Sequence, residues 1–192
     1  GQRGPGVRPA GQVDAPVELI PGAEPRKPKN QKPAKSVTSL ENLKIGDTFA
    51  GSAAPWVVKQ PISITCEVEP KAAGGVIVAH GGTAVGYSLY VKENRLVFAA
   101  RRDRNDITRI TSQNLPAGRI AVEARLGEDG TMTLVINGNA AATGKAGGLL
   151  ERQPMEAFCV GHDDQMPLDS YDGKSKFTGS IEHLRVTTDK RP

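Results

Sequence analysis

The feature that most constrains this chain is an alternation of apolar and polar side chains that recurs, segment after segment, from residue 62 onward. In segments 62–68 and 120–126 every even-numbered residue is apolar, and the residues between them are polar, charged or small. Successive side chains of a β-strand point to opposite faces, so each segment is predicted to be a strand with one apolar face. Because such faces need a second layer to cover them, the pattern indicates two packed sheets rather than one open sheet.

Turn signals separate the alternating segments. Glu128–Gly130 and Asn137–Gly138 are short polar turns with glycine, typical of hairpins, and Lys92–Arg95 is a third polar turn. Residues 39–45 fit either a single helical turn or an edge strand. No other segment has a helical period of useful length. The predicted strands span residues 62–68, 76–79, 87–91, 96–100, 107–111, 120–126, 131–136, 139–143, 155–160 and 177–187.

Short strands joined locally, without intervening helices, predict an all-β fold over residues 36–192: a two-sheet antiparallel sandwich, or jelly roll. Residues 1–35 differ in composition, since they hold half of the 14 prolines, seven basic and three acidic side chains. We expect this tail to be a flexible, disordered Pro/Lys-rich linker. The net charge of +4 belongs to the tail, because the remaining residues hold 18 charges of each sign. The domain is neutral and contains no known motif for nucleic-acid recognition, so the sequence gives no indication of a nucleic-acid partner.

Membrane insertion and a disulfide framework are both disfavoured. No apolar run approaches the roughly 20 residues of a membrane span, and no signal-peptide pattern occurs in this chain. Cys66 and Cys159 are too few for a disulfide framework or a cysteine-based zinc site. Two buried thiols are the favoured interpretation, and a single bridge between them is the alternative.

Several motifs, specific only in combination, lie within about residues 56–188. One group is a glycine-bounded strand followed by a hairpin with Gly86, Tyr87, Leu89 and Tyr90. A second group lies at the C-terminal end of this region. Two shorter motifs, Leu115–Gly118 and Val135–Gly138, lie between the first group and the second. The second group comprises Gly161, His162, Asp163, Asp164, Pro167, Leu168, Tyr171, Phe177, Thr178, Gly179, Ser180 and Ile181.

Together these motifs resemble the C-terminal jelly-roll region of bacterial arylsulfatases, within the concanavalin A-like and laminin G-like superfamily. The resemblance implies a non-catalytic accessory module, packed on or tethered to a sulfatase-type catalytic domain in the same or a parent polypeptide. It also implies a periplasmic or secreted location. A carbohydrate-binding, lectin-like module, with sulfated polysaccharide as the candidate ligand, is the alternative function.

Catalytic residues are not predicted. Sulfatases need a Cys or Ser in a Cys/Ser-x-Pro-x-Arg setting, and neither Cys66 nor Cys159 has it. Glucanases of the same superfamily place paired carboxylates on one strand. Glu67 and Glu69 share a strand face, but no further acidic residue follows at the required spacing, so a solvated strand edge is the better interpretation.

An arginine-rich stretch supplies the candidate ligand-binding residues. Arg101, Arg102 and Arg104 follow a predicted strand, and guanidinium groups bind sulfate, phosphate or carboxylate through paired hydrogen bonds. Tyr171 is the aromatic candidate for stacking on a sugar. Asp103 and Asp106 lie in the same stretch, so a solvated, self-neutralised loop is the competing interpretation.

A cluster of aspartates supplies the candidate metal ligands. Asp163, Asp164 and Asp169 lie close in sequence, and calcium favours several oxygen ligands from one loop. Laminin G-like relatives carry such ions at the rim, so the resemblance makes calcium the one candidate cofactor. The alternative is that Asp163 and Asp164 hydrogen-bond the backbone of a long loop.

Overall fold

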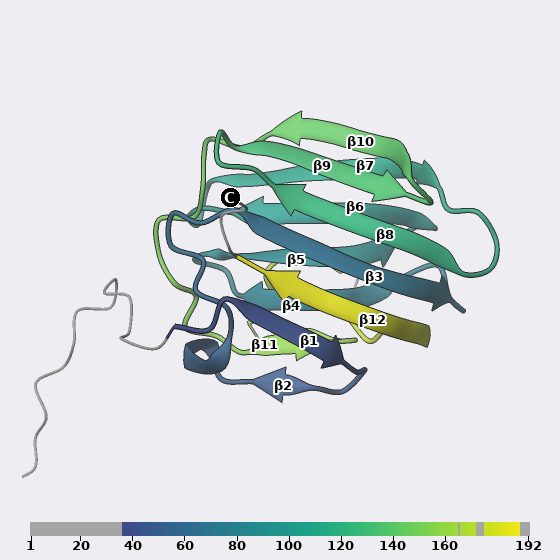
Figure 1. The fold of residues 1–192 in the computed structure, drawn as a ribbon, viewed down its shortest axis with the longest axis horizontal. Helices are drawn as coiled ribbons and strands as arrows, with labels where there is room; N and C mark the ends of the chain where they lie inside the picture. The colour runs from purple at the N-terminus through teal and green to yellow at the C-terminus, as the bar shows by residue number, and fades with distance from the viewer. Residues whose placement is uncertain (1–35, 165, 172–174, 189–192) are drawn as a thin grey trace, which may run out of the picture.

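The computed structural model describes residues 36–164, 166–171 and 175–188, and in this part of the chain two six-stranded antiparallel sheets face each other (Figure 1). Sheet A runs β1-β12-β3-β8-β9-β10, and sheet B runs β2-β11-β4-β5-β6-β7. The elements are β1 (Ser39–Leu43), β2 (Thr48–Phe49), the 3₁₀ turn η1 (Gly51–Ala53), β3 (Ile62–Pro70), β4 (Gly75–Gly81), β5 (Gly86–Lys92), β6 (Arg95–Arg101), β7 (Ile107–Asn114), β8 (Ile120–Leu126), β9 (Thr131–Ile136), β10 (Asn139–Lys145), β11 (Phe158–Val160) and β12 (Gly179–Thr187). The predicted all-β sandwich is confirmed, and no helix among the described residues is long and apolar enough to cross a bilayer.

The core lies between the sheets and is built from the predicted apolar faces. In β3 buried and partly exposed residues alternate, and Ile62, Ile64 and Val68 have no exposed surface. Burial of each such side chain contributes roughly 1.5–3 kcal/mol, so the alternating faces hold the two sheets together. Both cysteines are buried and free, as favoured from the sequence.

Two of the predicted hairpin turns take the conformation that their residues favour. Glu93 and Asn94 have φ angles of 51° and 60°, and Asn137 and Gly138 have φ angles of 50° and 79°. Two consecutive residues with positive φ form the turn whose twist matches antiparallel strands. These turns fix the β5–β6 and β9–β10 registers.

Four segments were left open by the sequence, differ from its expectation or lie outside the described residues. Residues 39–45 contain the edge strand β1, which pairs with β12, and the two-residue strand β2 was not predicted. The predicted strand 155–160 shortens to β11, because the preceding carbonyls pack against Gly51 and Met155 is 70% exposed. The predicted linker, residues 1–35, lies outside the described residues.

Sheet B is buried on both faces at its centre. The described part of the β11–β12 connection crosses its outer face, where Leu168 packs against outward-facing residues of β4, β5 and β6. The outer cluster consists of Val76, Ala79, Tyr90, Val97, Ala99 and Leu168, with Ile107 and Tyr171 packed against it. This cover explains why β4 reads as a continuous apolar run, and it forms one wall of the candidate site.

Candidate functional site

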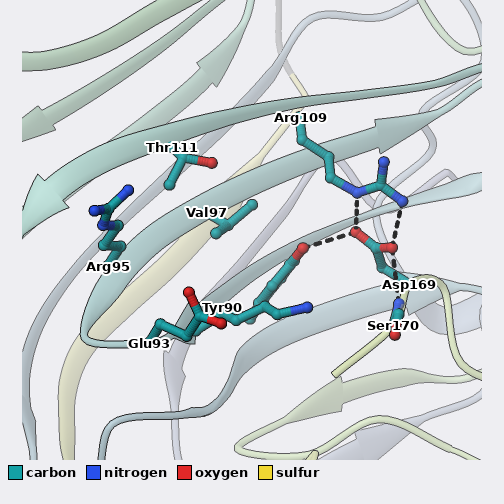
Figure 2. Close-up of a pocket in the computed structure, with 9 residues that line it drawn as sticks. Tyr90, Glu93, Arg95, Val97, Arg109, Thr111, Asp169 and Ser170 are labelled. Atoms are coloured by element: carbon teal, nitrogen blue, oxygen red, sulfur yellow. Dashed lines mark hydrogen bonds and ion pairs between the residues drawn. The ribbon is translucent and has the colours of Figure 1, made fainter. Parts of the chain in front are cut away.

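A groove of about 270 Å³ lies on the outer face of sheet B, beside the β11–β12 connection (Figure 2). Three neighbouring strands and the connection supply its lining. Residues two apart on a strand share a face, and the register aligns Tyr90 with Val97 and Val97 with Thr111. The lining residues are Tyr90, Lys92, Glu93, Arg95, Val97, Arg109, Thr111, Asp169 and Ser170.

Asp169 anchors the connection to the sheet at one end of the groove. Arg109 on β7 donates two hydrogen bonds to its carboxylate, from Nε to Oδ2 and from Nη2 to Oδ1, each 2.6 Å long. The Tyr90 hydroxyl donates to Oδ2 at 2.7 Å, and the Ser170 backbone N–H donates to Oδ1 at 2.7 Å. The Asp169 side chain is only 3% exposed, so these four donors replace its lost hydration.

The ionisation of this cluster follows from the same contacts. Burial alone would raise the pKa of Asp169, but the hydrogen bonds from Arg109 and Tyr90 outweigh burial and hold that pKa below its ordinary value. Burial, followed by the bond to Asp169, raises the pKa of Tyr90. The hydrogen bond to Asp169 raises the pKa of Arg109. The cluster therefore keeps an ionised carboxylate, a neutral phenol and a charged guanidinium.

Positive side chains border the space that remains. The Arg109 side chain is 45% exposed, and its Nη1 points away from Asp169 in Figure 2. Arg95 lies across the groove, where its Nε donates to Asn114 Oδ1 at 3.3 Å, and Lys92 completes the basic lining. With the hydroxyl of Thr111 alongside, three cations stand against the carboxylates of Glu93 and Asp169, so the lining keeps one excess positive charge for an oxygen-rich anion.

The structure does not gather the predicted arginines into one site. Arg101 donates from Nε to Leu168 O at 3.0 Å and from Nη1 to Arg104 O at 3.0 Å. Arg102 donates to Leu149 O at 3.2 Å and to Asp106 Oδ2 at 2.9 Å. Arg104 is exposed at the β6–β7 turn. Arg101 and Arg102 thus fasten two different loops, and their role in ligand binding stays a prediction.

Tyr171 and Asp163 form a second anchor beneath the connection. The Tyr171 hydroxyl donates to Asp163 Oδ2 at 2.8 Å and lies 3.0 Å from Ser88 Oγ. Asp163 also accepts from the N–H groups of Leu168 and Asp164, at 3.0 and 2.8 Å. The Tyr171 ring packs edge-on against Tyr90, with centroids 4.9 Å apart. Its hydroxyl is engaged inward, so only its ring surface is available to a ligand.

The three candidate calcium ligands use their oxygens within the chain. Asp164 Oδ1 accepts a hydrogen bond from Met166 N–H at 2.9 Å. Asp163 and Asp169 accept the hydrogen bonds described above. Among the described residues, these three carboxylates are not gathered closely enough to share an ion. The geometry matches the backbone-bonding alternative, and calcium binding stays a prediction.

Sequence reasoning missed most of the groove. Lys92 and Arg95 were assigned to a hairpin turn, and Thr111 was not singled out. The side-chain alternation of the strands was the available signal. Tyr90 and Lys92 share the outward face of one strand, and Arg109 and Thr111 share that of another. The missing information was which outward face the connection leaves open.

The fold defines the class of structure, an antiparallel two-sheet β-sandwich of the jelly-roll type. Neither protein-family models nor curated proteins gave a match to this chain. Solved structures did, at 15% sequence identity. The CBM40 domain of the Ruminococcus gnavus IT-sialidase, bound to α2,6-sialyllactose, has a TM-score of 0.61, and the match covers 82% of this chain and 95% of that one.

Two further structures share the fold. Domains LG4-5 of the mouse laminin α1 chain match at 15% identity and a TM-score of 0.58, over 79% of this chain and 38% of that chain. The binding domain of botulinum neurotoxin DC, in complex with rat synaptotagmin II, matches at 15% identity and a TM-score of 0.53, over 70% and 33%. This chain therefore spans well under half of the laminin and neurotoxin chains, and the similarity concerns the fold.

Proposed function

We propose that this chain is a non-catalytic, lectin-like module that binds an acidic carbohydrate in the groove on sheet B. The observation that carries the proposal is that Lys92, Arg95 and Arg109 line one groove with a hydroxyl and an aromatic ring, against only two carboxylates, those of Glu93 and Asp169. The volume of the groove, about 270 Å³, lies just below the roughly 300–1,000 Å³ of typical ligand pockets. One terminal sugar therefore fits better than a long chain segment.

The solved structures support a sugar as the ligand. The CBM40 domain of the Ruminococcus gnavus IT-sialidase is bound to α2,6-sialyllactose in one solved structure and to α2,3-sialyllactose in another, and both ligands end in a carboxylate-bearing sugar. A neurotoxin binding domain of similar fold, with a TM-score of 0.50, is in complex with SialylT. The lining cations supply for this chain the charge that an acidic sugar requires.

We expect the chain to bind sialyllactose and not lactose, because the two differ by the acidic sugar. Arg95→Ala should weaken sialyllactose binding about 10-fold, since a hydrogen bond to a charged group contributes roughly 1.5–3 kcal/mol. Isothermal titration calorimetry measures both affinities. Arg125→Ala, an exposed arginine on β8 of the other sheet, is the matched control and should bind like the unchanged chain.

Heparin in place of sialyllactose distinguishes a sulfated polysaccharide from a carboxylate sugar. Equal affinity for lactose and sialyllactose, or equal effects of Arg95→Ala and Arg125→Ala, would refute the acidic-sugar proposal.

The second candidate role is the one implied by the arylsulfatase resemblance: an accessory module on a catalytic domain, in a secreted or periplasmic protein. Gly161, one of the motif glycines, has a structural role. Its N–H donates to Ile77 O and its carbonyl accepts from Phe177 N–H, both at 2.9 Å. These bonds tie the β11–β12 connection to sheet B. Stable co-purification with a sulfatase catalytic domain, in the absence of sugar binding, would favour this role.

A further inference from the structure

Three potential metal ligands converge on the outer face of sheet A, on the opposite side of the sandwich from the groove. Glu67 lies on β3, and Glu182 and His183 lie on β12. One carboxylate oxygen from each glutamate and one ring nitrogen of the histidine lie within 4.8 Å of one another. We call this group the sheet-A cluster.

A β-bulge explains why two consecutive residues reach the same face. Glu182 pairs with Glu67, and the next aligned pair is Arg185 with Thr65, so β12 holds one extra residue there. His183 has a φ angle of 54°, and its side chain is 76% exposed, whereas Leu184 is fully buried. In a regular strand His183 would point into the core. The bulge instead places an imidazole beside two carboxylates.

The charges of the cluster are only partly compensated. Glu67 and Glu182 are directly opposite each other, and like charges in this position destabilise a sheet. Arg119 donates to both oxygens of Glu182, at 2.7 and 3.2 Å, and lies 3.8 Å from Glu67 Oε2. One guanidinium thus faces two carboxylates, and His183 Nε2 lies 3.7 Å from Glu67 Oε2, so a cation placed among the three side chains meets two carboxylates and an imidazole.

Space for additional ligands adjoins the cluster. A hollow of about 350 Å³ is lined by Glu67 and His183 on one side and by Glu123 on the other. The small residues Ala121 and Gly138 leave it open between them. Water, or an exchangeable ligand, can therefore reach an ion held by the cluster.

We propose that Glu67, Glu182 and His183 bind a zinc ion, with the fourth position facing the hollow. Zinc takes imidazole nitrogen and carboxylate oxygen at about 2.0–2.2 Å in a tetrahedron, which puts ligand atoms roughly 3.3 Å apart. The cluster must contract from 4.8 Å, which exposed glutamate side chains achieve by rotation. Glu182 exchanges its paired bond to Arg119 for the metal. The site is independent of the proposed sugar groove.

Calorimetric titration of chelator-treated protein with Zn²⁺ tests the proposal. We expect one saturable site, weakened at least about 10-fold by His183→Gln or by Glu182→Gln. The chain has three histidines, His80, His162 and His183. His80 is fully buried and so is unsuitable as a control. His162→Gln is therefore the matched control and should leave the affinity unchanged. Unfolding curves of each variant without zinc show whether the fold is retained.

Arg119→Gln separates a metal site from a purely structural ion pair. Removal of the competing guanidinium should strengthen zinc binding, and the His183 ring resonances in NMR spectra should shift when zinc is added. Absence of saturable binding, or binding that survives His183→Gln undiminished, overturns the proposal. Weaker binding by Arg119→Gln than by the unchanged chain also counts against it.

Discussion

Gly179→Ala is expected to destabilise the domain by about 4 kcal/mol or more, a large part of the roughly 5–15 kcal/mol that stabilises a typical domain. Gly179 starts β12 with a φ angle of 127°, a conformation essentially restricted to glycine. A Cβ there would lie 2.0 Å from Glu69 O and 3.1 Å from Lys71 N. Both contacts are backbone atoms, of strand β3 and of the residue that follows it, so the β3–β12 pairing itself must separate.

Gly138→Ala is the matched control for Gly179→Ala. Gly138 also has a positive φ angle, 79°, but an added Cβ would meet nothing within 4 Å. We expect a cost of only about 1 kcal/mol from the backbone conformation. Urea unfolding of the three proteins measures the difference, and similar losses for the two variants would show that the close approach to Glu69 is unimportant.

Acid should destabilise the domain through His80, by about 1.4 kcal/mol for each pH unit between about 6 and about 3. His80 is fully buried, neither ring nitrogen has a hydrogen-bond partner, and the ring packs edge-on against Tyr87 and Phe158. Burial lowers the pKa of His80 from 6.5 to about 3. Since the unfolded chain binds the proton more readily, stability is complete above pH 6.5 and falls as the pH decreases toward 3.

His80→Phe should flatten this dependence, because a phenyl ring fills the site without a proton to bind. His80→Leu serves the same purpose if the larger ring does not fit. Urea midpoints at pH 7, 5.5 and 4.5 measure the slopes, and parallel slopes for His80→Phe and the unchanged chain would contradict the role of His80.

Much of the architecture could be predicted from local patterns. The alternation in 62–68 and 120–126 predicted β3 and β8, and the polar turns at 92–95 and 137–138 predicted hairpins that the structure confirms. Tyr87 and Tyr90 are three residues apart, so a strand turns them to opposite faces: Tyr87 lies in the core between the sheets and Tyr90 on the outer face. These features depend on side-chain period and turn conformation, which neighbouring residues determine.

The candidate sites depended on long-range contacts. Arg109 is placed in the groove by Asp169, which lies 60 residues later in the chain and accepts two hydrogen bonds from its guanidinium group. The bulge that exposes His183 cannot be read from its neighbours in sequence, because it is defined by the register between β12 and β3.

The sequence by itself thus determined the strand pattern, the turns and the need for two layers, because each follows from the conformation and solvation of adjacent residues. Only the tertiary structure decided which arginines fasten loops, which outward face the β11–β12 connection covers, and which charged groups meet. The physical reason is that hydrogen bonding and charge compensation act through space, so the partner of a polar group is set by how the sheets and loops pack.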